Sequence, residues 1–98
     1  MTANIAKLNP GFTFHAEGRS GAIFYKRDEH VLELYWEMSG VPDYDILLWI
    51  DESYFWTYPK KEKIEDTERD QIIRALDLWL RKENLRSDAF PPASPKVI

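Results

Sequence analysis

The sequence predicts an α+β fold, with a mainly antiparallel sheet of four to five strands and one C-terminal helix packed on one face of that sheet. Most of residues 12–58 fall into short runs that alternate apolar and polar side chains, which is the pattern of half-buried strands. The turns between these runs are too short for crossover connections, so they favour antiparallel pairing. Residues 66–83 instead repeat apolar side chains at three- and four-residue steps, as an amphipathic helix does.

Five ranges carry the strand pattern, namely Phe12–Glu17, Ala22–Lys26, Val31–Met38, Asp45–Asp51 and Tyr54–Tyr58. The third is the clearest, because its even-numbered residues are all large and apolar while its odd-numbered positions include two glutamates. The apolar side of this strand is expected to face the helix. Two glycines mark the turn at 18–21, and Pro59 is expected to end the last strand.

The helix is expected to begin at a cap formed by Asp66 or Thr67 and to run to about Glu83. Acidic residues in its first turn and basic residues in its last turn both suit the helix dipole. The preceding segment, Lys60–Glu65, is expected to be a charged linker. The core between sheet and helix is expected to include Trp36, Trp56 and Trp79.

The 98 residues are expected to form a single domain, 1–98, with flexible ends at 1–10 and 91–98. No cysteine is present, which excludes disulfides, thiolate zinc sites and cysteine nucleophiles. No apolar run approaches the roughly 18 residues of a membrane span, and the N-terminus lacks the pattern of a signal peptide. We therefore expect a cytoplasmic protein without membrane contact.

Acidic and aromatic residues are concentrated in one segment. Residues 28–59 contain eight carboxylates and eight aromatic residues but neither Lys nor Arg, and the net charge of the whole chain is −4. A negative chain does not favour binding to nucleic-acid phosphates. The aromatic residues indicate that the segment is folded, and carboxylates exposed on it favour a basic protein partner.

The predicted dimensions leave one face of the sheet open. A helix of this length is ~25 Å long and about 10 Å wide, whereas five strands span ~20 Å. A single helix of this size can cover only one of the two faces of the sheet. Strand alternation gives the open face a mixture of carboxylates and aromatic rings. The residues expected to bind a partner there are Glu33, Tyr35, Glu37, Asp45, Trp49 and Asp51. Three interpretations stay open: a binding face, a polar face that only keeps the sheet solvated, or a structural homodimer through the same face.

The sequence contains no catalytic constellation, so a non-enzymatic protein is expected, without cofactor or metal. Glu33 and Glu37 lie ~13 Å apart along a strand, farther than the ~5–9.5 Å that separates glycosidase carboxylates. His15 and His30 fall at an outward strand position and in a turn. The four glycines form no phosphate-binding loop. A small-ligand-binding protein is a further alternative, and it would need a pocket with a perturbed titrating group.

Four short elements recur in a family of small proteins. They are Glu37-x-x-Gly40, Asp45 before an apolar strand, Trp56-x-x-Pro59, and Asp66-x-Glu68-Arg69-x-x-Ile72-Ile73. Over residues 37–73 the chain thereby resembles small, mostly uncharacterised bacterial α+β proteins, some of which are similar to the immunity proteins of polymorphic toxin systems. The resemblance implies a strand-rich sheet with a C-terminal helix and non-enzymatic binding of a cognate protein. An acidic face would suit inhibition of a nuclease toxin through its basic groove.

Overall fold

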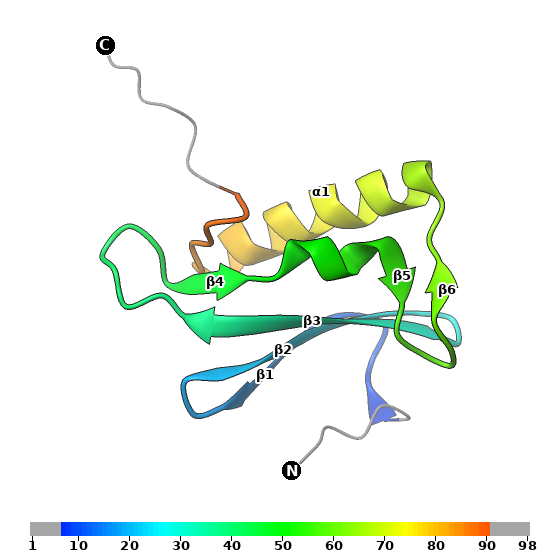
Figure 1. The fold of residues 1–98 in the computed structure, drawn as a ribbon, viewed down its shortest axis with the longest axis horizontal. Helices are drawn as coiled ribbons and strands as arrows, with labels where there is room; N and C mark the ends of the chain where they lie inside the picture. The colour runs from blue at the N-terminus through cyan, green and yellow to red at the C-terminus, as the bar shows by residue number, and fades with distance from the viewer. Residues whose placement is uncertain (1–6, 91–98) are drawn as a thin grey trace.

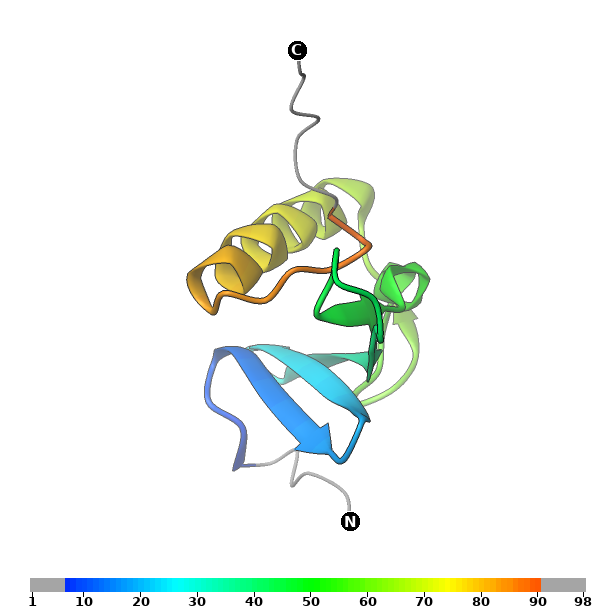
Figure 2. The same cartoon turned by 90° about the vertical axis from the view of Figure 1, so that its left-hand side faces the viewer.

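Three long strands form a continuous meander, and a short fourth strand extends it. In the computed structural model, which describes residues 7–90, the strands are β1 (Gly11–Glu17), β2 (Ser20–Arg27), β3 (His30–Met38) and β4 (Ile46–Leu48). Each strand pairs antiparallel with the next, in the order β1-β2-β3-β4. Helix α1 (Asp66–Lys82) lies along one face of this sheet (Figure 1 and Figure 2). The predicted α+β class, with an antiparallel sheet and a C-terminal helix, is confirmed.

A glycine in β2 allows the long strands to pack closely. Trp36 of β3 stands opposite Gly21 in the register, and its indole Nε1 reaches across β2 to donate a hydrogen bond to the His15 carbonyl oxygen at 3.1 Å. The same indole stacks on Phe14 of β1, with ring centroids 4.7 Å apart. A Cβ atom at Gly21 would lie 2.0 Å from the His15 oxygen. Only a residue without a side chain therefore fits at this position.

The fourth strand is shorter than predicted, and the prediction of a strand over Asp45–Asp51 is wrong beyond Leu48. At Trp49 the backbone leaves the extended conformation, with φ −82° and ψ 77°, and Ile50–Tyr54 forms the short 3₁₀ helix η2. The predicted alternation therefore stops at the end of β4, and the acidic residues that follow belong to a helical turn.

A contact with the distant helix explains why η2 replaces the predicted strand. Ser53 is fully buried, and its hydroxyl donates to the Ile50 carbonyl at 2.6 Å. The same hydroxyl accepts a hydrogen bond from Arg69 Nε of α1 at 2.9 Å, and the Arg69 guanidinium lies 3.9 Å from the centre of the Tyr54 ring. These contacts join η2 to the first half of α1 and stabilise its helical conformation.

The predicted fifth strand, Tyr54–Tyr58, meets the main sheet only through an isolated bridge between Tyr58 and Val31. Its centre forms β5 (Phe55–Trp56), which pairs with β6 (Glu62–Lys63) in a separate two-stranded sheet. The expectation of a linker over Lys60–Glu65 is therefore wrong. The physical reason is burial, because Ile64 and the tryptophan of β5 both belong to the hydrophobic core. The chain folds back at this point to close one end of that core.

Helix α1 begins without the predicted side-chain cap. The expectation that Asp66 or Thr67 forms the cap is wrong, because Glu65 occupies the cap position in an extended conformation and makes no capping hydrogen bond through its side chain. The position of the chain just before the helix is instead fixed by Ile64, whose backbone N–H donates to the Tyr54 carbonyl at 3.0 Å. Acidic residues in the first turn and basic residues in the last turn are as predicted.

The helix ends in a Schellman motif. Asn84 adopts a left-handed conformation with φ 63°, and its N–H donates to the Arg81 carbonyl at 3.1 Å. The N–H of Leu85 donates to the Leu80 carbonyl at 2.9 Å.

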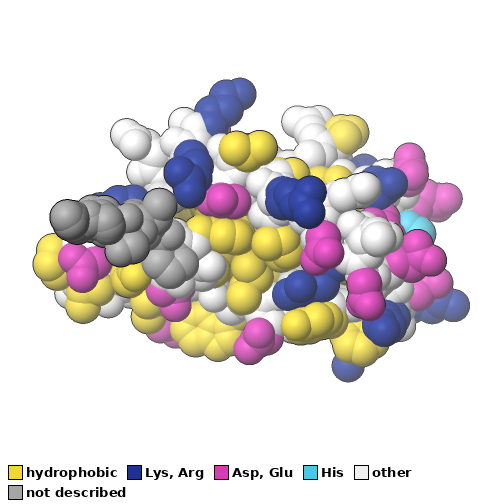
Figure 3. All heavy atoms as spheres, turned by 90° about the horizontal axis from the view of Figure 1, so that it is seen from above, with side chains coloured by type: hydrophobic (Ala, Val, Ile, Leu, Met, Phe, Trp, Pro, Cys, Tyr) yellow, Lys and Arg dark blue, Asp and Glu magenta, His cyan; other side chains and the backbone are white. Residues whose placement is uncertain are grey.

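On the surface seen from the helix side, Lys and Arg side chains are spread among Asp and Glu (Figure 3). The outer face of the molecule on this side thus carries charges of both signs.

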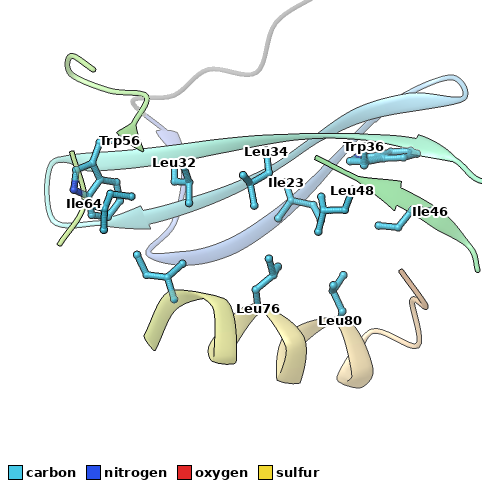
Figure 4. Close-up of a cluster of buried hydrophobic side chains, with 11 residues drawn as sticks. Ile23, Leu32, Leu34, Trp36, Ile46, Leu48, Trp56, Ile64, Leu76 and Leu80 are labelled. Carbon is cyan, nitrogen blue, oxygen red and sulfur yellow. The ribbon is translucent and has the colours of Figure 1, made fainter. Parts of the chain in front are cut away.

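The hydrophobic core fills the space between α1 and the sheet. Leu76 and Leu80 point from the helix toward the sheet (Figure 4), and each is at most 2% exposed. On β3, the even-numbered residues Leu32, Leu34 and Trp36 are also buried, and Trp36 is the most exposed of the three at 3%. The predicted inward side of this strand is therefore confirmed for these three positions, whereas it is wrong for Met38, which lies at the end of β3 and is 49% exposed.

The other predicted core tryptophans differ in burial. Trp56 is buried in the same cluster, at 5% exposed. Trp79 is only partly buried and stacks on Phe12 of β1, with ring centroids 5.4 Å apart. Trp79 therefore seals the edge of the core where α1 passes over the outermost strand.

The sheet face turned away from α1, called the distal face below, is only partly open. At one end Leu8 packs against the buried residues Ala22, Phe24 and Val31. Lys26 Nζ also donates to the Leu8 carbonyl at 3.1 Å. The expectation of an open face is corrected for this end of the sheet, because the N-terminal segment covers it. Residues 7–10 are the only part of the ends expected to be flexible, 1–10 and 91–98, that lies within the described residues.

Candidate functional site

Two exposed aromatic rings meet on the distal face near the end of β4. Tyr35 of β3 and Trp49, which follows β4, form an edge-to-face pair with ring centroids 5.0 Å apart. The two residues are 38% and 42% exposed. Their backbones are joined as well, because the Trp49 N–H donates to the Tyr35 carbonyl at 2.9 Å. The backbone hydrogen bond between Trp49 and β3 thus holds the two rings together at the surface.

Carboxylates surround this aromatic pair. Glu37 accepts a hydrogen bond from the Tyr35 hydroxyl at 2.9 Å, and Glu52 of η2 accepts one from the Tyr35 backbone N–H at 3.0 Å. Glu33 precedes Tyr35 on the same side of β3. We call the following six residues the acidic–aromatic surface: Glu33, Tyr35, Glu37, Trp49, Asp51 and Glu52.

Along part of its length, the edge of β3 has no neighbouring strand. β4 pairs only with residues 36–38, and the chain returns to this edge at Val31, which bonds to the loop after β5. Between these points two side chains take the place of a neighbouring strand as hydrogen-bond acceptors. Glu52 accepts from the backbone N–H of Tyr35, and Thr57 Oγ1 accepts from the backbone N–H of Glu33 at 2.9 Å. The Glu33 carbonyl points to the same side as its N–H. Within residues 7–90 no hydrogen-bond donor to that carbonyl is found.

A groove of about 510 Å³ opens beside this unpaired edge. We call it the β3 groove, and its walls include Glu33, Tyr35, Asp51, Glu52, Phe55 and Lys61. Three of these side chains are carboxylic acids and one is an amine, so acidic groups are in excess. The Lys61 ammonium lies 4.9 Å from the centre of the Phe55 ring. The groove therefore combines negative charge with aromatic walls.

The environment of the β3 groove perturbs one of its acids. Burial raises the pKa of Glu33 above its ordinary value of 4.5, and the nearby Glu52 carboxylate raises that pKa further. The folded state therefore binds this proton more tightly than the unfolded chain does. The resulting stabilisation is complete below the ordinary pKa and is lost as the pH rises through the folded-state pKa. At neutral pH, ionised Glu33 destabilises the fold, and a cation in the groove would offset that effect.

Asp45 lies apart from the acidic–aromatic surface. Its carboxylate accepts three hydrogen bonds from Arg86, from the backbone N–H at 2.7 Å, from Nη2 at 3.2 Å and from Nε at 3.3 Å. The hydrogen bonds from the Arg86 side chain and backbone lower the pKa of Asp45. The backbone N–H of Ile46 also donates to the Arg86 carbonyl at 3.1 Å. Asp45 thus ties the segment after α1 to the start of β4, whereas the other five predicted residues come together.

Sequence reasoning did not assign four residues that line the groove: Glu52, Phe55, Thr57 and Lys61. Negative charge is favourable in the first turn of a helix, and Asp51 and Glu52 lie in the first turn of η2, so this acidic pair could have separated Glu52 from the preceding strand. The position of Phe55 depends on the pairing of β5 with β6, which connects residues on both sides of a turn. No local pattern indicates that Lys61 lies over the Phe55 ring.

Comparisons with family models, curated proteins and solved structures find no match to this chain. Within residues 7–90, no helix is long and apolar enough to cross a membrane. The same residues contain no group of three or more His, Cys, Asp or Glu side chains arranged to hold a metal ion. A functional proposal for this chain therefore depends on the geometry and charge of the acidic–aromatic surface.

Proposed function

We propose that this chain is a non-enzymatic cytoplasmic protein that binds a basic protein partner through the acidic–aromatic surface. The exposed pair formed by Tyr35 and Trp49 is the observation that carries the proposal. Tyrosine and tryptophan are enriched among the residues that dominate the binding energy of protein interfaces. Two such rings in contact on the surface, with their backbones joined, provide a preorganised anchor for a partner.

The charge around the rings determines which partners are favoured. Glu33, Glu37 and Glu52 lie around the aromatic pair, and like charges this close repel each other unless a cation is present. A partner that brings Lys or Arg to this surface relieves the repulsion and is also attracted at long range. A nuclease with a basic substrate groove fits this description. In that case the chain acts as an immunity-type inhibitor, which agrees with the binding of a cognate protein that the resemblance implies.

Capture of the partner from the source cells tests the proposal. The immobilised chain is expected to retain a protein of basic isoelectric point at about 50 mM salt, and to lose at least about 90% of it at about 500 mM salt, because screening weakens attraction between exposed charges. The variant Leu78→Ala serves as the control, since Leu78 is 68% exposed on α1, away from the surface. This variant should retain the same protein.

Two results would contradict the proposal. The first is a retained protein that is acidic and whose binding does not change with salt. The second is a stable dimer of the chain itself in sedimentation experiments at both salt concentrations. That result would support the structural homodimer instead, although self-association would place the carboxylates of two copies against each other.

A further inference from the structure

The interrupted edge of β3 brings three kinds of recognition group to one groove. The Glu33 carbonyl faces the gap left by β4, the carboxyl groups of Glu33 and Glu52 line the same space, and the rings of Tyr35 and Phe55 form part of its walls. We infer that the β3 groove binds an arginine side chain of the partner protein, an inference that rests on the proposed function. The groove would hold the guanidinium, while the Tyr35–Trp49 pair contacts the surrounding surface of the partner.

The first support for this inference is a cation that the chain itself places in the groove. The Lys61 ammonium lies 4.9 Å from the centre of the Phe55 ring, within the range of a cation–π contact. The groove contains three carboxylic acids against this one amine, so Lys61 leaves an acidic excess of two groups. A second cation from the partner would therefore meet both uncompensated carboxylates and an aromatic wall.

The donors and acceptors of the groove favour arginine over lysine. The Glu33 carbonyl and the Glu52 carboxylate are acceptors on two sides of the gap, and a planar guanidinium can donate to both while its face stacks on a ring. The fold already contains this arrangement elsewhere. Arg69 stacks on Tyr54 at 3.9 Å from the ring centre while its Nε donates to Ser53. The volume of about 510 Å³ is also within the range of pockets that hold small ligands.

Three small probes test the inference on the full chain. They are the acetylated amides of arginine, of lysine, and of citrulline, which has the shape of arginine without its charge. In an NMR titration we expect arginine amide to shift the backbone N–H signals of Glu33 and Tyr35 in a saturable manner, with a dissociation constant of roughly 1–10 mM. Its binding should be at least about threefold tighter than that of lysine amide and about tenfold tighter than that of citrulline amide.

Two variants remove charge from the groove while preserving its shape. Glu52→Gln keeps an oxygen that can accept from the Tyr35 N–H, and Glu33→Gln removes the acid that is destabilising when ionised. Each should weaken binding of arginine amide at least about fivefold. Glu33→Gln should also raise the melting temperature at pH 7 or leave it unchanged. Weaker binding by a variant that is no less stable separates loss of the site from partial unfolding.

The control variant is Glu83→Gln, which removes the same charge from the exposed C-terminal end of α1. It should bind arginine amide as the wild type does. Binding of arginine amide no tighter than that of citrulline amide, or unaffected by Glu52→Gln, would overturn the inference. Capture of a basic partner would then still support the proposed function. If arginine amide binds the groove but no basic partner is captured, the proposed function fails while the groove remains an arginine site.

Discussion

Replacing Tyr35 and Trp49 together with alanine is expected to weaken binding of the basic partner by at least about 3 kcal/mol, which is more than a roughly 100-fold rise in the dissociation constant. The two rings are the aromatic members of the acidic–aromatic surface and both are exposed, and the substitutions remove both. The carboxylates stay in place, so attraction at long range persists and the loss should appear as faster dissociation. Titration calorimetry and stopped-flow measurements with the captured partner provide both quantities.

The double variant should remain folded, so its loss of binding can be assigned to the surface. The hydrogen bonds from the Trp49 N–H to Tyr35 and from the Tyr35 N–H to Glu52 start from backbone groups that alanine retains. Loss of the edge-to-face contact is expected to reduce the free energy of unfolding by about 1 kcal/mol. The exposed residue Leu78 again supplies the control, and Leu78→Ala should bind with wild-type affinity. A folded double variant with an unchanged dissociation constant would show that the partner binds elsewhere.

The variant Gly21→Ala is expected to lower the free energy of unfolding by about 3 kcal/mol. The added Cβ would lie 2.0 Å from the His15 carbonyl oxygen, which already accepts the hydrogen bond from the Trp36 indole. Either β1 must move away from β2 or that hydrogen bond must break, and each change disturbs the stacking of Trp36 on Phe14. Urea denaturation followed by tryptophan fluorescence measures the loss.

A second glycine variant separates the steric clash from the general cost of replacing glycine. Gly18 has a positive φ of 73°, and a Cβ there would meet nothing within 4 Å. The variant Gly18→Ala therefore changes only backbone strain and should cost about 1 kcal/mol. Equal losses for the two variants would contradict the assignment of a close approach at Gly21.

The elements that were predicted correctly from the sequence are those whose pattern of side chains lies within the element itself. In β3, alternation over the eight residues Val31–Met38 indicates the strand and the buried side of Leu32, Leu34 and Trp36, because the whole repeat lies within a single element. The end of β4 has a different cause. Ser53 accepts its hydrogen bond from Arg69, which lies 16 residues farther along the chain. Alternation over Asp45–Asp51 carries no information about that contact, so the predicted strand was too long.

The residues of the candidate site also fall into two groups, those placed by a local repeat and those placed by contacts between distant parts of the sequence. Tyr35 and Glu37 share one side of a strand that was predicted correctly, and their placement follows from the two-residue repeat. Asp45 fits the same repeat, yet its carboxylate binds Arg86, 41 residues later in the sequence. Glu52 enters the site only because η2 turns the chain back toward β3. Residues brought in by long-range contacts are therefore the ones that periodicity misplaces.

The most direct test of the proposed binding surface is an NMR titration of the chain with its captured partner, observed at the indole N–H signals of its four tryptophans. Binding at the acidic–aromatic surface predicts a large shift or broadening for Trp49, together with changes at the backbone N–H of Tyr35 and Glu52. The indole of Trp79, which packs between α1 and β1 on the other side of the sheet, should stay unchanged. Changes at Trp79 and along α1, with Trp49 and Tyr35 unaffected, would contradict the proposed surface.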